Sequence, residues 1–259
     1  MARATMFLYS LGVYGLFLAV FLYLVAFVGN IAVPRSIDVG PASSTAAAIA
    51  IDVLLVLLFG LQHSVMARPA FKRWVTRFIP APIERSTFVL AASLLLALLM
   101  WQWRPITLSI WHVEGTAATL LWGAFGLGWA VLLLSTFLIN HFDLFGLRQT
   151  WLHLRHRPTP PLAFRTTLLY RIVRHPIMLG FLLAFWATPD MSAGHLLFAL
   201  AMTGYILIGV HHEERDLVRA LGEDYVAYRR TTPALIPGLP GASEDLPVRP
   251  ASAPLASGH

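Results

Sequence analysis

Cysteine is absent from the 259-residue chain. The protein therefore forms no disulfide, holds no cysteine-ligated cluster and offers no thiolate nucleophile of its own. Charged residues are also scarce, at 12% of the sequence, where a soluble domain carries about a quarter. Hydrophobic residues make up 57% of the chain and the mean hydropathy is +0.68, so the composition indicates an integral membrane protein.

Five apolar runs are long enough to cross a bilayer as helices, at about 6–29, 46–66, 86–104, 117–139 and 193–212. A sixth run, at about 177–188, is short and is bounded by Pro176 and Pro189. A turn-like sequence, 190–194, follows it. The predicted fold class is therefore all-α: a polytopic membrane helical bundle of five long spans plus one short helix, which forms a C-terminal helical hairpin.

The distribution of Lys and Arg predicts the orientation. With the N-terminus in the cytoplasm and six crossings, 17 of the 19 Lys and Arg residues fall on the cytoplasmic side, and only Arg35 and Arg104 fall outside. We therefore expect an N-in/C-in protein, in a bacterial inner membrane, whose pI near 10.2 reflects topology rather than nucleic-acid binding. Residues 1–237 are predicted to form a single transmembrane domain, and 238–259 a flexible cytoplasmic tail. The loop at about 140–175 should pack under the bundle.

Polar side chains within membrane helices are costly and mark candidate functional sites. The topology brings many of them to one layer, at the cytoplasmic membrane boundary. Any one histidine there is more commonly structural, but their concentration on one side favours a shared pocket. The residues in this layer include Tyr9, Gln62, His63, Asn140, His141, Asp143, Arg174, His175, His211, His212, Glu213 and Glu214.

Two sequence motifs indicate a binding site more specifically than the shared position of these residues at the membrane boundary. In "RHPIMLG" (174–180), Pro176 suits the first turn of a helix, whose free amides and positive end favour an anionic group beside Arg174. Gly180 permits close approach of a ligand or another backbone. In "HHEERDLVRALGEDYVAYRR" (211–230), two adjacent carboxylates leave a membrane helix. Together with the Arg-His pair, they are suited to binding both ends of a zwitterionic ligand.

These motifs resemble the C-terminal signature of the isoprenylcysteine carboxyl methyltransferase-like membrane family: Arg-His-Pro-x-Tyr-x-Gly, a helical hairpin, Glu-Glu-x-x-Leu and Gly-x-x-Tyr-x-x-Tyr. The chain has Met178 in place of the first Tyr, and Thr188-Pro189 where Asn-Pro is common. The resemblance implies S-adenosyl-L-methionine as cofactor. It implies that Arg174 and His175 bind the cofactor carboxylate, and that Glu213 or Glu214 binds its amino group or ribose. The cofactor-binding residues that follow from it are Arg174, His175, Pro176, Gly180, His212, Glu213, Glu214, Leu217, Tyr225, Tyr228 and Arg229.

The N-terminal half looks like the NnrU-like branch of the same family. The segments that carry this likeness are "LQHSVMARPAFKRW" (61–74), "PIERSTFVL" (82–90), "WQWRPI" (101–106) and "NHFDLFGLRQ" (140–149). Within the branch, chain length, "WQWRPI" (101–106) and the basic "LRHRP" loop (154–158) look most like the methanethiol S-methyltransferases. This resemblance implies methyl transfer from S-adenosylmethionine to methanethiol, which gives dimethyl sulfide and S-adenosylhomocysteine.

Methyl transfer to a thiol requires loss of the thiol proton, because the thiolate is the strong nucleophile. His141 is our first candidate for the catalytic base, with Asp143 orienting it and His63 and Tyr9 as further catalytic candidates. Gln62 and Asn140 are expected to line the substrate side. No metal site is expected, since cysteine is absent and the histidines lack metal-ligand spacing.

Other functions remain open from the sequence. A haem-b protein would use His63 and His141 as axial ligands. The NnrU likeness also admits a non-catalytic membrane factor, and the acceptor of a methyltransferase could be an isoprenyl thiol or carboxylate. A sterol-type reductase would share the C-terminal fold but use a nicotinamide cofactor. The oligomeric state is not predicted.

Overall fold

The computed structural model describes residues 2–160 and 166–239, and within them five helices are long and apolar enough to cross a membrane. A sixth apolar helix, α9 (Pro176–Trp186), has 11 residues and spans about 16 Å, well short of a hydrocarbon core of about 30 Å. The predicted set of five long spans and one short helix is confirmed, and the chain is an integral membrane protein. The long helices are α1 (Arg3–Val28), α2 (Thr45–Ala67), α4 (Glu84–Gln102, preceded by the 3₁₀ turn η1, Ala81–Ile83), α5 (Gly115–Ile139) and α10 (Ala193–Leu221).

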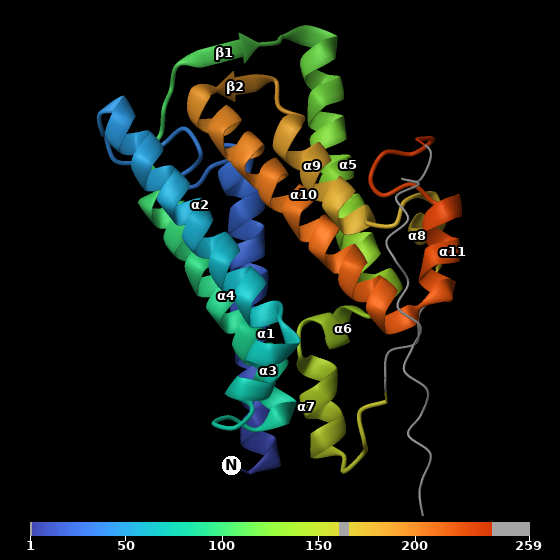
Figure 1. Ribbon diagram of the computed structural model, residues 1–259. Coiled ribbons are helices and arrows are strands. Elements are labelled where there is room, and N and C mark those ends of the chain that lie inside the picture. The colour runs from blue at the N-terminus through green and yellow to red at the C-terminus, as the bar shows by residue number, and fades with distance from the viewer. Residues whose placement is uncertain (1, 161–165, 240–259) are drawn as a thin grey trace, which may run out of the picture.

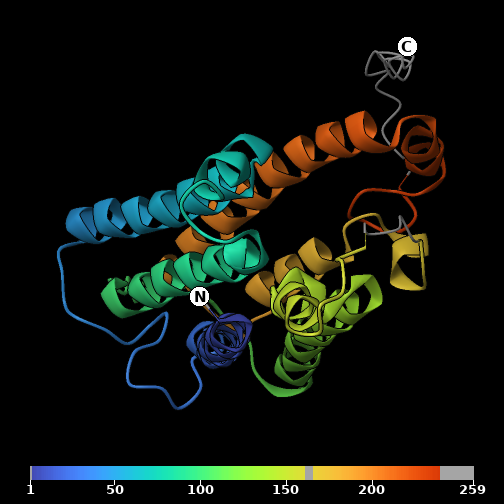
Figure 2. The same cartoon turned by 90° about the horizontal axis from the view of Figure 1, so that it is seen from below.

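The helices form two groups that α10 joins (Figures 1 and 2). In the first group α4 packs against both α1 and α2, and in the second α9 packs along α5. Helix α10 contacts α2 in one group and α9 in the other. The start of α1, the ends of α2, α5 and α10 and the start of α9 all lie at one end of the bundle, which we call the inner end.

Helices α5 and α9 approach closely because each presents a glycine to the other. A Cβ on Gly180 would lie 2.7 Å from the carbonyl oxygen of Gly128 and 2.8 Å from the amide of Leu132. Small residues allow such backbone approach in membrane proteins, where dispersion contacts hold helices together. Of the two expected neighbours of Gly180, a ligand or another backbone, the structure shows the backbone of α5.

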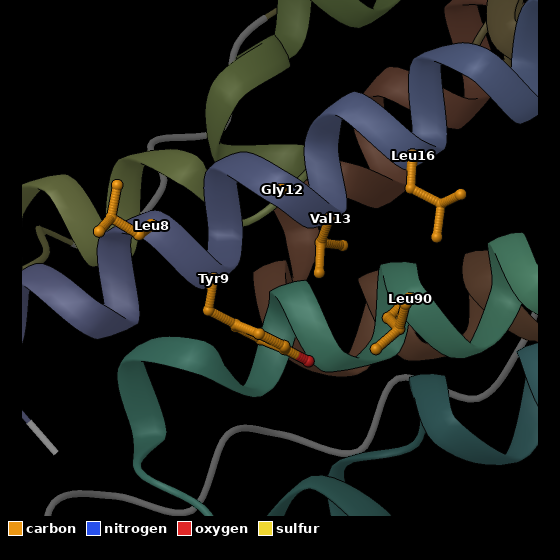
Figure 3. A pocket seen from close by; sticks show the side chains of 6 residues that line it. All are labelled: Leu8, Tyr9, Gly12, Val13, Leu16 and Leu90. Atoms are coloured by element: carbon orange, nitrogen blue, oxygen red, sulfur yellow. The ribbon is translucent and has the colours of Figure 1, made fainter.

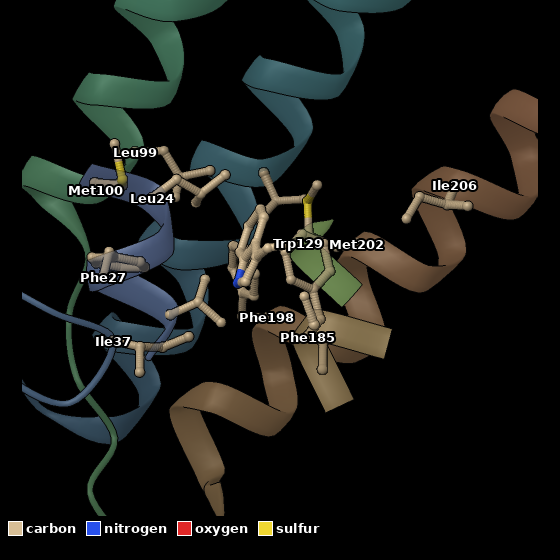
Figure 4. Close-up of a cluster of buried hydrophobic side chains, with 14 of the residues drawn as sticks. Leu24, Phe27, Ile37, Leu99, Met100, Trp129, Phe185, Phe198, Met202 and Ile206 are labelled. Atoms are coloured by element: carbon tan, nitrogen blue, oxygen red, sulfur yellow. The ribbon is translucent and has the colours of Figure 1, made fainter. Parts of the chain in front are cut away.

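The apolar core lies where α1, α2, α4, α5, α9 and α10 meet, and Figure 4 shows its centre. Its largest members come from different helices, among them Phe27, Trp129, Phe185 and Phe198. Their rings meet mostly edge to face, as aromatic quadrupoles prefer. The outward faces of the long helices are apolar as well, which suits lipid contact; Leu8, Leu22, Leu54, Leu120 and Leu200 are more than half exposed.

A small sheet at the outer end departs from the all-α prediction. Strand β1 (Ser109–His112) pairs antiparallel with β2 (Asp190–Ser192), with Ser109 opposite Ser192 and His112 opposite Asp190. The connection after α4 thus satisfies backbone groups of the α9–α10 turn, where the sequence indicated only a turn. The pairing joins segments about 80 residues apart, so local patterns did not reveal it.

The described parts of the basic loop, 140–160 and 166–175, pack beneath the bundle, as expected. They contain α6 (His141–Leu144), α7 (Leu147–Leu154) and α8 (Leu169–Ile172), and α7 lies along the inner part of α1. The remaining short helices are α3 (Pro69–Val75) and α11 (Glu223–Thr231). The predicted tail, 238–259, lies outside the described residues from 240 onward.

Candidate functional site

Four ionisable side chains, Arg174, His175, Glu214 and Arg229, form one buried group at the inner end; we call it the Arg-Glu cluster. The Nε and Nη2 atoms of Arg174 each lie 2.6 Å from Oε1 of Glu214. The same oxygen lies 3.1 Å from Nε2 of His175, and Nε of Arg229 lies 3.3 Å from Oε2. One carboxylate is therefore shared by three basic side chains, two of which directly precede α9 while the third lies near the end of α11.

The cluster also binds the chain that follows α11. Nη1 of Arg174 donates to the carbonyl oxygens of Arg229, at 3.1 Å, and Thr232. The backbone amides of Arg174 and His175 donate to the carbonyls of Pro233 and Ala234, at 2.9 and 3.0 Å. The guanidinium that was expected to bind a cofactor carboxylate thus has protein partners, and only 1% of the side chain is exposed.

The other residues assigned to the cofactor differ in burial and in their contacts with this cluster. Tyr225 is buried and its ring lies 5.8 Å from that of Tyr228, whose hydroxyl donates to the carbonyl of Tyr170. Burial raises the pKa of Tyr228 to about 12, so its phenol stays protonated. Leu217 is half-buried on α10. His212 is exposed, beside His211, and joins none of the ion pairs of the cluster.

The groups beside the cluster fit a zwitterionic ligand. Pro176 occupies the first turn of α9, and the next amides, of Ile177 and Met178, have no carbonyl partner within the helix because of their position. These two N–H groups suit a carboxylate. The Glu213 side chain is 51% exposed, with Oε2 3.6 Å from Nδ1 of His175, and it suits an ammonium group. Carboxylate and ammonium are the two charges of the amino-acid part of S-adenosylmethionine, so the residues present fit that part of the cofactor.

A second polar site surrounds His141, which is 4% exposed at the inner end of α5. Both of its ring nitrogens have partners: Nε2 lies 2.7 Å from Oη of Tyr14, and Nδ1 lies 2.8 Å from Oγ1 of Thr136. The ring of Phe137 stacks on the imidazole with centroids 4.2 Å apart. Burial lowers the pKa of His141, so the imidazole is neutral at neutral pH.

The hydrogen bonds of Thr136 assign the tautomer. Its hydroxyl donates to the carbonyl of Leu133 at 2.7 Å, so Oγ1 accepts from His141, which must carry its proton on Nδ1. Nε2 then holds the lone pair and accepts from the hydroxyl of Tyr14. With both nitrogens engaged, His141 has none left for a haem iron, which disfavours the haem interpretation.

Two of the catalytic candidates have partners other than the His141 ring. Asp143 does not orient the ring; its Oδ1 lies 3.6 Å from Nη1 of Arg148 instead. Tyr9 does not adjoin His141 either, because its hydroxyl bonds Thr87 on α4, at 3.1 Å. The residue of α1 that contacts His141 is Tyr14, five positions further on. The sequence analysis missed it, since a tyrosine in an apolar helix carries no local signal.

The structure also separates the other substrate-side candidates. The His63 ring lies among Phe59, Phe88 and Tyr205, and its Nδ1 is buried without a hydrogen-bond partner. Nε2 of Gln62 donates to the sulfur of Met66. Asn140 contributes its backbone carbonyl to the first turn of α6, at 2.9 Å from the amide of Leu144.

Two cavities lie apart from these sites. A groove of about 330 Å³ between α1 and α4 is lined by Leu8, Tyr9, Gly12, Val13, Leu16 and Leu90 (Figure 3). It is apolar except for the Tyr9 hydroxyl, which points to α4. A smaller cavity of about 150 Å³ lies at the outer end, where Asn30, Asp38, Trp122 and His195 are among its lining residues. Neither contains a residue of the Arg-Glu cluster.

Comparison with known proteins identifies close relatives over nearly the whole chain. The chain is 55% identical to methanethiol S-methyltransferase 2 of Bradyrhizobium diazoefficiens, over 92% of each chain. It is 52% identical to methanethiol S-methyltransferase of Mycobacterium tuberculosis, over 92% of this chain and 98% of the other. A more distant relative is nurim of Mus musculus, at 28% identity over 67% of this chain and 70% of the other. No family model and no solved structure matches the chain.

Proposed function

The chain belongs to the methanethiol S-methyltransferase family, and from that premise we propose that it transfers the methyl group of S-adenosylmethionine to the thiol of methanethiol. The products are dimethyl sulfide and S-adenosylhomocysteine. The observation that carries this proposal is the sharing of Glu214 by three basic side chains beside the free amides of α9, at the same end of the bundle as a buried neutral histidine.

The residues around the Arg-Glu cluster would hold the cofactor. The amides of Ile177 and Met178 bind its carboxylate and Glu213 binds its ammonium group, while the Tyr225 and Tyr228 side borders the adenosine. Arg174 and Glu214 do not contact the cofactor in this proposal. Their pairing fixes the start of α9 against the end of α10, which keeps the two amides and Glu213 at a constant distance from each other. When bound, S-adenosylmethionine supplies an activated methyl group on a sulfonium.

The acceptor side is apolar and reaches the membrane. Phe137 and Phe142, which flank His141, are each at least half exposed on the outer surface of the bundle. A small lipophilic thiol concentrates in the bilayer and can reach this position without crossing water. Exclusion of water from the site then leaves the thiolate poorly solvated and more reactive. The positive-inside pattern supports a cytoplasmic position for the inner end, where the cofactor is available.

Headspace gas chromatography tests the proposal. Membranes containing the protein, supplied with methanethiol and a cofactor whose transferred methyl is deuterated, should release dimethyl sulfide that carries the label. A matched preparation with Glu213→Gln should need more cofactor for the same rate. Unlabelled or background dimethyl sulfide from the wild-type protein would refute the reaction. If an added isoprenyl thiol received the labelled methyl group and methanethiol did not, the acceptor would be the larger thiol.

A further inference from the structure

The hydrogen bonds that end on His141 all run in one direction. Tyr14 donates to Nε2, Nδ1 donates to Thr136, and Thr136 donates to the carbonyl of Leu133, with donor–acceptor distances of 2.7, 2.8 and 2.7 Å. The direction is fixed at the carbonyl, which can only accept. The oxygen of Tyr14 therefore begins the chain with its lone pairs available for a further donor.

We propose that this further donor is the thiol, and that Tyr14 is the catalytic residue that contacts it; the inference rests on the proposed function. The thiol proton passes to the oxygen of Tyr14 as the phenol proton passes to Nε2 of His141. The sulfur lone pair freed from the S–H bond forms the new carbon–sulfur bond while the carbon–sulfonium bond of the methyl donor breaks. Two neutral thioethers leave, and the proton remains on His141 until water removes it.

The position of Tyr14 relative to α9 supports this role. Gly180 contacts Gly128 and Leu132, and α5 and α9 run antiparallel. Thr136 lies one helical turn after Leu132 on α5, so it is level with the start of α9. The hydroxyl of Tyr170, just before α9, reaches the carbonyl of Ser135 at 3.4 Å. The relay thus begins at the same level of the bundle as the free amides of Ile177 and Met178.

The surroundings make proton transfer depend on the substrate. The rings of Phe137, Phe142 and Phe145 enclose the imidazole. The charged groups on neighbouring elements have other partners: Arg85 donates to the carbonyl of Leu144, and Asp143 pairs with Arg148. A protonated His141 would have no protein carboxylate to neutralise it among the described residues. The thiolate supplies the missing negative charge, so the proton moves when the acceptor is present.

The test compares Tyr14→Phe with Tyr23→Phe, which removes a hydroxyl from the same helix and the hydrogen bond to the Arg35 carbonyl. With methanethiol at neutral pH, kcat of Tyr14→Phe should fall by about 10²–10⁴-fold, the usual contribution of general-base catalysis. The loss should shrink with rising pH as more thiol ionises. With hydrosulfide, which is smaller and largely ionised at mildly alkaline pH, the two variants should differ by less than about tenfold. Cofactor affinity should be unchanged in both.

A second variant keeps the proposal testable if Tyr14→Phe proves unstable. His141→Gln retains an acceptor for the Tyr14 hydroxyl but cannot take a proton. It should show the same dependence on thiol acidity, and the double variant should be no slower than the slower single variant, since the two residues act as one unit. Equal rates of wild type and Tyr14→Phe on methanethiol would overturn the relay, as would a loss that is the same for methanethiol and hydrosulfide. If the wild-type protein forms no dimethyl sulfide, the proposed function itself fails.

Discussion

Arg174 and Glu214 form a buried pair in which two guanidinium nitrogens lie 2.6 Å from one carboxylate oxygen, with side-chain exposures of 1% and 11%. The two residues are 40 positions apart and belong to the start of α9 and the end of α10. Sequence motifs assigned both of them to a ligand. The structure pairs them with each other, so the pair connects the start of α9 to the end of α10, where the proposed cofactor site lies.

Replacement of one partner of this pair should destabilise the fold. Arg174→Ala leaves the carboxylate of Glu214 buried without its main partner, which costs about 3–5 kcal/mol. The measurement is thermal or denaturant unfolding of the purified protein in detergent. Arg219→Ala is the matched control. Arg219 pairs with Asp216 on the exposed part of α10, the helix that carries Glu214, and this pair contributes less than about 1 kcal/mol. Equal losses for both variants would contradict the buried connection.

The contact between α5 and α9 should tolerate no side chain at Gly180. A methyl group there meets the Gly128 carbonyl at 2.7 Å, so Gly180→Ala must separate the helices and should cost about 1–3 kcal/mol. Gly126→Ala, on an exposed face of α5, meets nothing within 4 Å and should be neutral or slightly stabilising. Because α9 carries the proposed carboxylate site, Gly180→Ala should also weaken cofactor binding. Unchanged stability and affinity would show that the contact is not restrictive.

His112 should make the outer end sensitive to alkaline pH. Its hydrogen bonds with Asp190 and Glu114 raise its pKa above the ordinary value of 6.5. The stability that this gives is fully present below pH 6.5 and is lost as the pH rises through the raised pKa. The difference in unfolding temperature between wild type and His112→Asn should therefore disappear at alkaline pH, and salt should reduce it because the ring is exposed. A difference independent of pH would contradict this assignment.

His141 should make the folded protein less stable at acid pH. Burial lowers its pKa, so between the lowered value and 6.5 the unfolded chain binds a proton that the folded protein does not. Wild type should lose stability relative to His141→Gln as the pH falls below 6.5. The same unfolding experiment, run in acid buffers, measures this difference. A gap that stays constant down to low pH would mean that the imidazole takes up protons freely in the folded state.

Helix content and spans followed from composition and length, because a bilayer admits few other structures for long apolar runs. The charged motifs were also recognised in the sequence, and the structure brings Arg174, His175, Glu214 and Arg229 together. The partners within the site were not predictable. Nothing local distinguishes Tyr14 from Tyr9, and their different neighbours depend on how α1 is rotated against α4 and α5. The same applies to β1 and β2, which pair across a long sequence separation.

The sequence by itself determined that the chain spans a membrane and carries polar groups at one end of its helices, because hydropathy and charge depend on residue type and order alone. Only the tertiary structure decided which of those groups meet. In that structure Arg174 pairs with Glu214, His141 hydrogen-bonds Tyr14, and Gly180 packs against the backbone of α5. Such contacts depend on helix rotation and register, which packing between distant segments sets and no local pattern encodes.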